Sequence, residues 1–117
     1  MIVYLTTDLM MASSANSFAR QHNIKMTQVA NQTAALEAID QERPHLFLID
    51  LQTPGLDIPD LSKRLKKLAD SIQPLIVSYA QHVQVDQLQQ AREAGFDQVL
   101  TRGQMNQQMG QFIAAAI

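Results

Sequence analysis

The sequence predicts a doubly wound α/β sandwich, in which helices cover both faces of a parallel sheet, as a single domain over residues 1–117. One observation is the apolar run from Leu46 to Ile49, which leads directly into Asp50 and is followed by Pro54 and Gly55. A short apolar run bounded in this way is typical of a strand buried on both faces, as in parallel sheets. The other observation is that such runs alternate with longer, helix-spaced segments along the whole chain, which is the pattern of α/β folds.

Five segments are predicted as strands because they are short, apolar or β-branched, and lie between turn residues. Residues 2–5, 46–51 and 75–80 are largely apolar, which predicts strands inside the sheet. Residues 25–30 alternate in polarity and favour a strand near an edge. Residues 97–101 have only two apolar members and form the last predicted strand.

Between these strands the apolar residues recur at helical spacing. The predicted helices cover residues 12–22, the segment between Asn31 and Pro44, a segment beginning at Asp60, residues 83–94 and residues 104–116. Asn31 and Asp60 are predicted N-caps, and Gly95 is the predicted C-terminal glycine of the fourth helix. For the first helix Asp8, Ser13 and Ser14 are all candidate caps.

Composition excludes several classes of function. The net charge of −2 gives no electrostatic basis for binding nucleic acid or an anionic membrane. The chain has no cysteine, which excludes disulfides and thiolate chemistry. No apolar run approaches the roughly 20 residues of a membrane span, and the apolar opening lacks the basic segment of a signal peptide. We therefore expect a cytoplasmic protein, and the three histidines are too scattered to predict a metal site.

The segment Leu48–Asp57, which reads Leu-Ile-Asp-Leu-Gln-Thr-Pro-Gly-Leu-Asp, resembles the phosphoacceptor strand and following loop of response-regulator receiver domains. Residues 94–102 are similar to the family's fifth strand with its flanks, and residues 74–80 resemble its fourth strand. The resemblance covers the whole chain. It implies a flavodoxin-like (βα)5 sandwich with strand order 2-1-3-4-5, and a site at the carboxyl edge where the first and third strands diverge.

The resemblance places Asp50 at the phosphoacceptor position. It places Thr6 and Thr7 where the family has an acidic pair that holds magnesium, an ion that prefers carboxylate oxygens. Asp8 is acidic but lies one position further along, so we expect its side chain to point elsewhere. The family's chemistry depends on neutralising the charge of the phosphoryl group, and two neutral hydroxyls do not supply that.

Other positions of the family's site also differ here. Tyr79 stands where the family has a small hydroxyl residue, Arg102 where it has a lysine, and Val99 where it has an aromatic switch residue. A shift of one residue would bring Ser78 to the hydroxyl position, but it would reverse the facing of every side chain in that strand, so we do not favour it. Asp50 and Arg102 are predicted to form a structural ion pair.

We therefore predict an atypical receiver, or pseudo-receiver, that is not an enzyme and needs no cofactor. It would bind a signalling protein or a second copy through the face of helix 83–94, strand 97–101 and helix 104–116, including Gln87, Gln90 and Val99. One alternative is a phosphoacceptor receiver in which Asp50, Asp8 and backbone groups bind magnesium weakly. The other is a small-ligand sensor whose pocket lies between Thr6, Asp50, His82 and Arg102.

Two further clusters are open to more than one interpretation. The basic residues Lys63, Arg64, Lys66 and Lys67 favour a solvated helix face, with a surface for an acidic partner as the alternative. The apolar residues Met105, Met109 and Phe112 have helical spacing, which favours core packing over a docking stripe.

Overall fold

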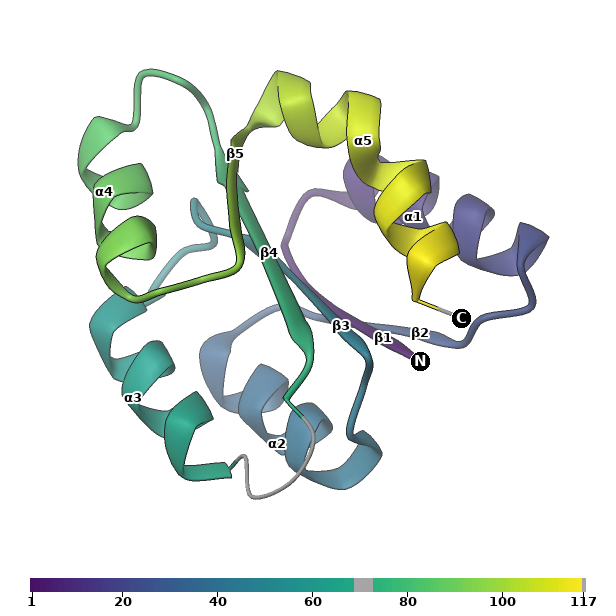
Figure 1. Ribbon diagram of the computed structural model, residues 1–117, viewed down its shortest axis with the longest axis horizontal. Coiled ribbons are helices and arrows are strands. Elements are labelled where there is room, and N and C mark those ends of the chain that lie inside the picture. The colour runs from purple at the N-terminus through teal and green to yellow at the C-terminus, as the bar shows by residue number, and fades with distance from the viewer. Residues whose placement is uncertain (69–72, 117) are drawn as a thin grey trace.

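A computed structural model describes residues 1–68 and 73–116 of the chain. Strands and helices alternate throughout (Figure 1): β1 (Ile2–Leu5), α1 (Leu9–Gln21), β2 (Met26–Val29), α2 (Gln32–Glu42), β3 (Leu46–Asp50), α3 (Ile58–Leu68), β4 (Leu75–Ala80), α4 (Val85–Glu93), β5 (Gln98–Thr101) and α5 (Arg102–Ala115). The strands form one parallel sheet in the order β2-β1-β3-β4-β5. The predicted fold class and strand order are confirmed.

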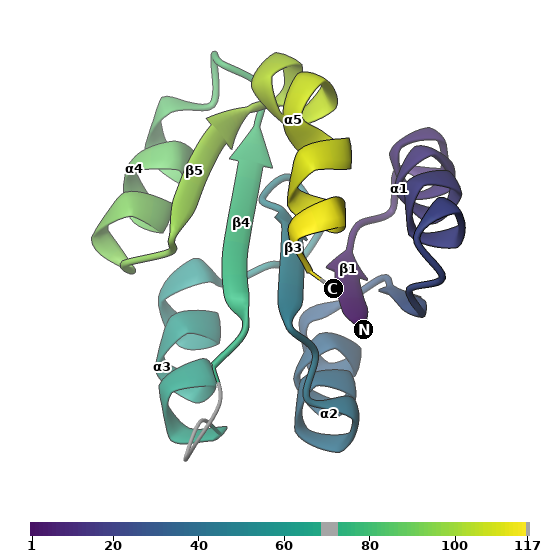
Figure 2. The same ribbon diagram turned by 45° about the vertical axis from the view of Figure 1, so that its right-hand side comes forward.

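The helices form two layers around the sheet. Figure 2 shows α1 and α5 on one face and α2, α3 and α4 on the other. Each layer buries its own core, because alternate residues of a strand point to opposite faces. The α1/α5 face holds Tyr4, Leu48, Tyr79 and Met105, and the opposite face holds Leu5, Ile49, Leu61 and Ala91. Met105 and Met109 are fully buried in the first of these cores, as their spacing predicted.

Helix boundaries follow the capping residues. Asn31 caps α2 by accepting from the Ala34 amide, and Gly95 follows α4 with a φ of +79°, as predicted. Asp8 caps α1 by accepting from the amides of Met10 and Met11, which decides among the three candidates. Because Asp8 lies so early, α1 begins three residues before the predicted start.

The other predicted helix starts that differ are those of α3, α4 and α5, and α4 begins at Val85 rather than at residue 83. Asp60, the predicted cap, lies inside the first turn of α3. Asp57, directly before the helix, caps it instead, because its Oδ1 accepts from the Asp60 backbone N–H. The last helix begins at Arg102 rather than at residue 104. Thr101 and Gln104 form a reciprocal capping box there, in which each side chain accepts from the other residue's amide.

Across residues 1–68 and 73–116, none of the helices is both long enough and apolar enough to cross a membrane.

Candidate functional site

Asp50 is the last residue of β3, and its side chain is on the α1/α5 face of the sheet. It is 6% exposed. Its Oδ2 accepts a hydrogen bond from the Thr6 hydroxyl at 2.8 Å, and its Oδ1 accepts one from the backbone N–H of Gln52 at 3.0 Å. Both oxygens of the buried carboxylate are therefore bound by neutral donors of the chain itself.

Thr6 holds Asp50 in a fixed direction. Its hydroxyl oxygen accepts from the Asp8 amide at 2.9 Å while its proton is donated to Asp50. Because Thr6 is fully buried and follows β1, these bonds tie the ends of the two neighbouring strands β1 and β3 together. Thr7, the other residue at the acidic-pair positions, is exposed.

The predicted ion pair between Asp50 and Arg102 is wrong, because Arg102 pairs with Asp8 instead. The Arg102 guanidinium donates to Asp8 Oδ2 at 2.5 Å, and Asp8 Oδ1 caps α1. These bonds hold the pKa of the Asp8 carboxyl below its ordinary value. The bond from Arg102 has the largest effect, and the bond from the Met11 backbone N–H has the next largest. The same contact raises the pKa of Arg102. The Asp8 carboxylate therefore caps α1 and pairs with Arg102.

Tyr79 fills the space beside Asp50. The register pairs Tyr79 with Asp50 and Tyr4 with Leu48, so the two tyrosines approach each other across the intervening strand β3. Their hydroxyls lie 2.5 Å apart and their rings meet edge to face. Ser78 faces the other way and donates to the Gln98 carbonyl, so the register that we preferred for this strand is confirmed.

Burial raises the pKa of both tyrosine hydroxyls. It raises the pKa of Tyr79 to about 12, with the Asp50 charge acting in the same direction. The pKa of Tyr4 is raised further above its ordinary value by burial and by its proximity to Tyr79. The side chain at the hydroxyl position is thus a bulky, neutral group held by a second buried phenol.

Two glutamines make contacts that no pattern in the sequence predicts. Gln52 joins Asp50 to the β4–α4 connection. Its backbone N–H donates to Asp50, and its side-chain Oε1 accepts from the backbone N–H of Gln81 at 2.9 Å. Gln32 of α2 holds the far end of the same loop by accepting from the Asp57 amide and donating to Asp60. Neither contact has a local sequence signal, since each joins elements distant along the chain.

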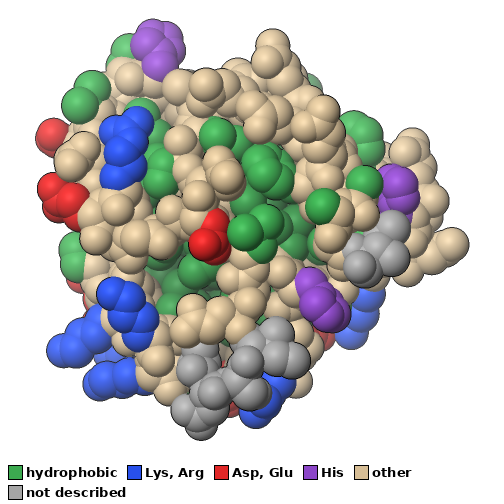
Figure 3. Space-filling view, in the orientation of Figure 1, with side chains coloured by type: hydrophobic (Ala, Val, Ile, Leu, Met, Phe, Trp, Pro, Cys, Tyr) green, Lys and Arg blue, Asp and Glu red, His purple; other side chains and the backbone are tan. Residues whose placement is uncertain are grey.

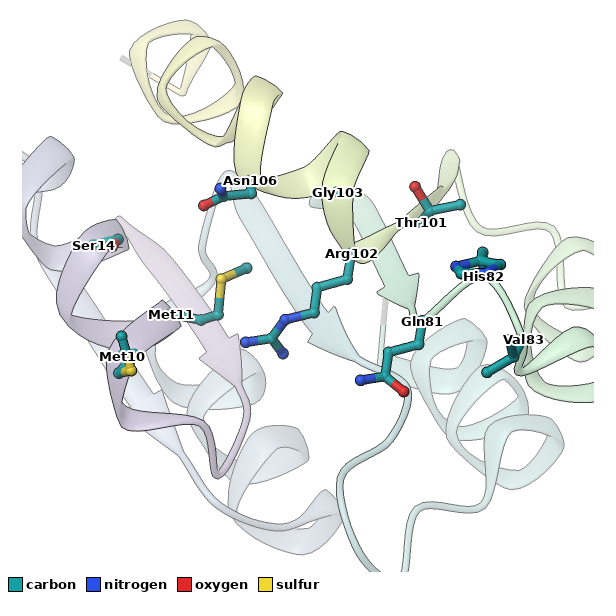
Figure 4. A pocket seen from close by; sticks show the side chains of 10 residues that line it. All are labelled: Met10, Met11, Ser14, Gln81, His82, Val83, Thr101, Arg102, Gly103 and Asn106. Atoms are coloured by element: carbon teal, nitrogen blue, oxygen red, sulfur yellow. The ribbon is translucent and has the colours of Figure 1, made fainter.

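A groove of about 810 Å³ opens at the carboxyl edge of the sheet between α1, the β4–α4 connection and the start of α5. Figure 4 shows the Arg102 side chain extending across it, with Met10 on one side and Val83 on the other. His82 and Arg102 line the groove as the sensor alternative required. Thr6 and Asp50 are buried and are not among its lining residues, so the groove includes two of the four residues of that alternative.

These residues do not fit a magnesium ion. Thr6 and Thr7 carry no charge, both oxygens of Asp50 are engaged, and the Asp8 carboxylate is held by Arg102 and by the α1 amides. Over the described ranges, 1–68 and 73–116, no group of three or more acidic, histidine or cysteine side chains could hold a metal ion. We therefore derive no reaction step through a metal.

The residues of the predicted docking face occupy different environments. Val99 of β5 is half-buried and packs against the core under α4. Gln87 is half-buried, and its side-chain oxygen is fully enclosed without a hydrogen-bond partner among the described atoms. Gln90 is exposed and lines a groove between α3 and α4.

Comparison with known proteins identifies the family. Residues 6–114 match the response regulator receiver domain. The chain belongs to this family. It is also similar to sporulation initiation phosphotransferase F of Bacillus subtilis, with 30% identity over 80 residues, which are 68% of this chain and 63% of that protein. The aligned part of this receiver domain thus spans less than two thirds of its curated relative.

Solved structures agree on the fold. A receiver domain of a response regulator from Bermanella marisrubri superposes with a TM-score of 0.80 at 23% identity, over 98% of this chain and 95% of that one. The receiver domain of Ssk1, in a co-crystal with the Saccharomyces cerevisiae histidine phosphotransfer protein Ypd1, superposes with a TM-score of 0.76 at 17% identity, over 99% and 90%. This chain is therefore a receiver domain of two-component signalling in both sequence and fold.

Proposed function

We propose that this receiver domain acts as a protein-interaction module whose state is not controlled by phosphorylation of Asp50. The observation that carries the proposal is that the buried Asp50 carboxylate is held by neutral donors, the Thr6 hydroxyl and the Gln52 backbone N–H. A carboxylate is a poor nucleophile towards an anionic phosphoryl donor unless nearby positive charge stabilises the transition state. The threonines are neutral, and the Arg102 guanidinium, whose charge also acts on Asp50, forms its ion pair with Asp8.

Tyr79 supports the same proposal on steric grounds. The phenol lies beside Asp50 and is held by Tyr4 from within the core. A phosphoryl group on Asp50 would need room and donors on this side of β3, where the two rings now pack. Moving Tyr79 aside would strand the Tyr4 hydroxyl without its partner, and an unsatisfied buried group costs about 1–3 kcal/mol.

The proposed docking surface is the face made by α4, β5 and α5, held in one conformation. In the family, a small hydroxyl residue and an aromatic switch residue couple the site to this face. Here those two positions hold Tyr79 and Val99, so that coupled movement is not available. Val83, in the β4–α4 connection, and Val85, the first residue of α4, are 63% and 65% exposed. Exposed apolar residues that lie close together are a common feature of protein–protein contact sites. The Ssk1 receiver domain, a structural relative, is solved with a protein partner, which supports a partner of that kind here.

The test is chemical. The protein is incubated with acetyl phosphate and magnesium, or with beryllofluoride and magnesium, and examined by intact-mass spectrometry and amide NMR. We expect no covalent mass increase and no change in the amide spectrum. A mass increase that the Asp50→Asn variant abolishes would show a working phosphoacceptor and overturn the proposal.

A small-ligand sensor is the second candidate, favoured by the groove of about 810 Å³ that Arg102 and His82 line. A thermal-shift screen of organic anions tests it. A ligand that stabilises the protein, and no longer does so in a His82→Ala variant, would favour the sensor over the interaction module.

A further inference from the structure

A second groove, of about 470 Å³, lies between α3 and α4 on the opposite face of the sheet from Asp50. Lys63, Lys66 and Lys67 line it from α3. Their spacing of three and four residues places them on one face of the helix. Figure 3 shows basic side chains gathered at its lower left, over α3. The groove is therefore one concave surface with three cations along a single side.

The floor of this groove is small, apolar and fixed. Ser62 of α3 is 7% exposed and donates to the Ala94 carbonyl at the end of α4, at 3.2 Å, so the two helices are joined directly beneath it. Pro59 and Ala94 contribute compact apolar surface. The methylene stems of the lysines extend this apolar lining, because long basic side chains keep only their charged ends in water.

Among the described residues, 1–68 and 73–116, no ion pair balances the positive charge of the groove. The ion pairs among the described residues join Lys25 to Glu42, Arg64 to Asp60 and Arg102 to Asp8, and none includes the three groove lysines. Glu93 is the carboxylate among the lining residues, and its Oε1 accepts a hydrogen bond from Gln89 of its own helix. The described lining of the groove thus carries three lysines against one glutamate, in a chain whose net charge is −2.

We propose that the α3–α4 groove binds an acidic peptide segment of a partner protein, with apolar side chains on the floor and carboxylates against Lys63 and Lys66. The chemistry fits a peptide better than nucleic acid, since three cations are too few for a phosphate-tracking surface. It fits a peptide better than a membrane surface, because the apolar area lies in a concavity between two helices and does not project from the protein. The surface is separate from Asp50, so failure of this proposal leaves the proposed independence from phosphorylation intact.

The test uses a short fluorescein-labelled peptide rich in glutamate with leucines between, and a counterpart in which glutamine replaces glutamate. Binding is followed by fluorescence anisotropy, and the site is mapped by amide NMR. We expect the acidic peptide to bind, to weaken as salt is raised, and to shift amides of α3 and α4. Each of Lys63→Gln and Lys66→Gln should weaken binding about two- to five-fold, in line with exposed charge pairs.

Arg64→Gln is the matched control. It removes the same charge from the neighbouring position of the same helix, but Arg64 lies outside the groove and is paired with Asp60. Its effect on the dissociation constant should stay within about two-fold. The proposal is overturned if the acidic peptide does not bind, if Arg64→Gln weakens binding as much as Lys63→Gln, or if the lysines prove to be needed for binding phosphatidylserine vesicles and not the peptide.

Discussion

Replacing Asp50 with alanine should destabilise this receiver domain substantially. The carboxylate is buried and accepts from the Thr6 hydroxyl and from the Gln52 amide. Alanine leaves both donors without a partner. The Thr6 hydroxyl is fully buried and cannot be rehydrated freely, whereas Gln52 is exposed and its backbone N–H can regain water. A stranded buried donor costs about 1–3 kcal/mol and the more exposed Gln52 N–H costs less, so the variant should lower the free energy of unfolding by about 2–4 kcal/mol.

Urea unfolding followed by circular dichroism measures this change by linear extrapolation. Asp50→Asn is the matched control. The amide keeps one acceptor for Gln52 or for Thr6 but not for both, so its cost should be smaller, about 1–2 kcal/mol. A double-mutant cycle of Asp50→Asn with Thr6→Val should give a coupling energy of about 0.5–3 kcal/mol, because the two side chains touch.

One result would refute this reasoning directly. In a site where acidic side chains crowd together, removal of one carboxylate relieves repulsion and stabilises the protein. If Asp50→Ala has no effect or raises the free energy of unfolding, Asp50 is not satisfied by its neighbours in the way that its hydrogen bonds indicate.

Three further outcomes follow from the same geometry. Tyr4→Phe and Tyr79→Phe should each lower the free energy of unfolding in urea by about 1–3 kcal/mol. The double variant should cost little more than one of them, because replacing both partners leaves no buried hydroxyl stranded. Strictly additive costs would contradict the shared hydrogen bond. Since the pKa of Tyr79 is raised to about 12 in the folded protein, the unfolded chain releases its tyrosine proton first, and stability should fall as pH rises above about 10; tyrosinate absorbance appearing near pH 10 in the folded protein would contradict this. Arg102→Gln should raise the pKa of Asp8, seen by carboxyl NMR, while changing stability by less than about 1 kcal/mol because the pair is partly exposed; an unchanged Asp8 pKa would contradict the pairing.

The fold could be predicted because its signals are local. The apolar run that ends at Asp50 and the alternation of strands with helix-spaced segments determine which residues are buried, and the family resemblance then implies the strand order. The facing of β4 followed from periodicity as well, since Tyr79 and Ser78 point to opposite sides of the sheet. The helix starts were less certain because nearby residues compete as caps, as Asp57 and Asp60 do before α3.

The contacts of the site were harder to predict because they depend on reach and on distant partners. Arg102 has a long side chain that can meet either Asp50 or Asp8, and the choice depends on where α1 begins. The contact between Tyr4 and Tyr79 crosses β3, so no pairing of adjacent strands would suggest it. The role of Gln52 depends on the conformation of a loop, for which composition gives little guidance.

Magnesium titration followed by amide NMR tests the central claim most directly, because it asks whether the residues around Asp50 still form a cation site. We predict that the amides of Thr6, Thr7 and Gln52 do not shift at millimolar magnesium, since the nearby carboxylates are already engaged. Saturable shifts at these amides that disappear in Asp50→Asn would contradict the account and indicate a receiver domain that can be phosphorylated.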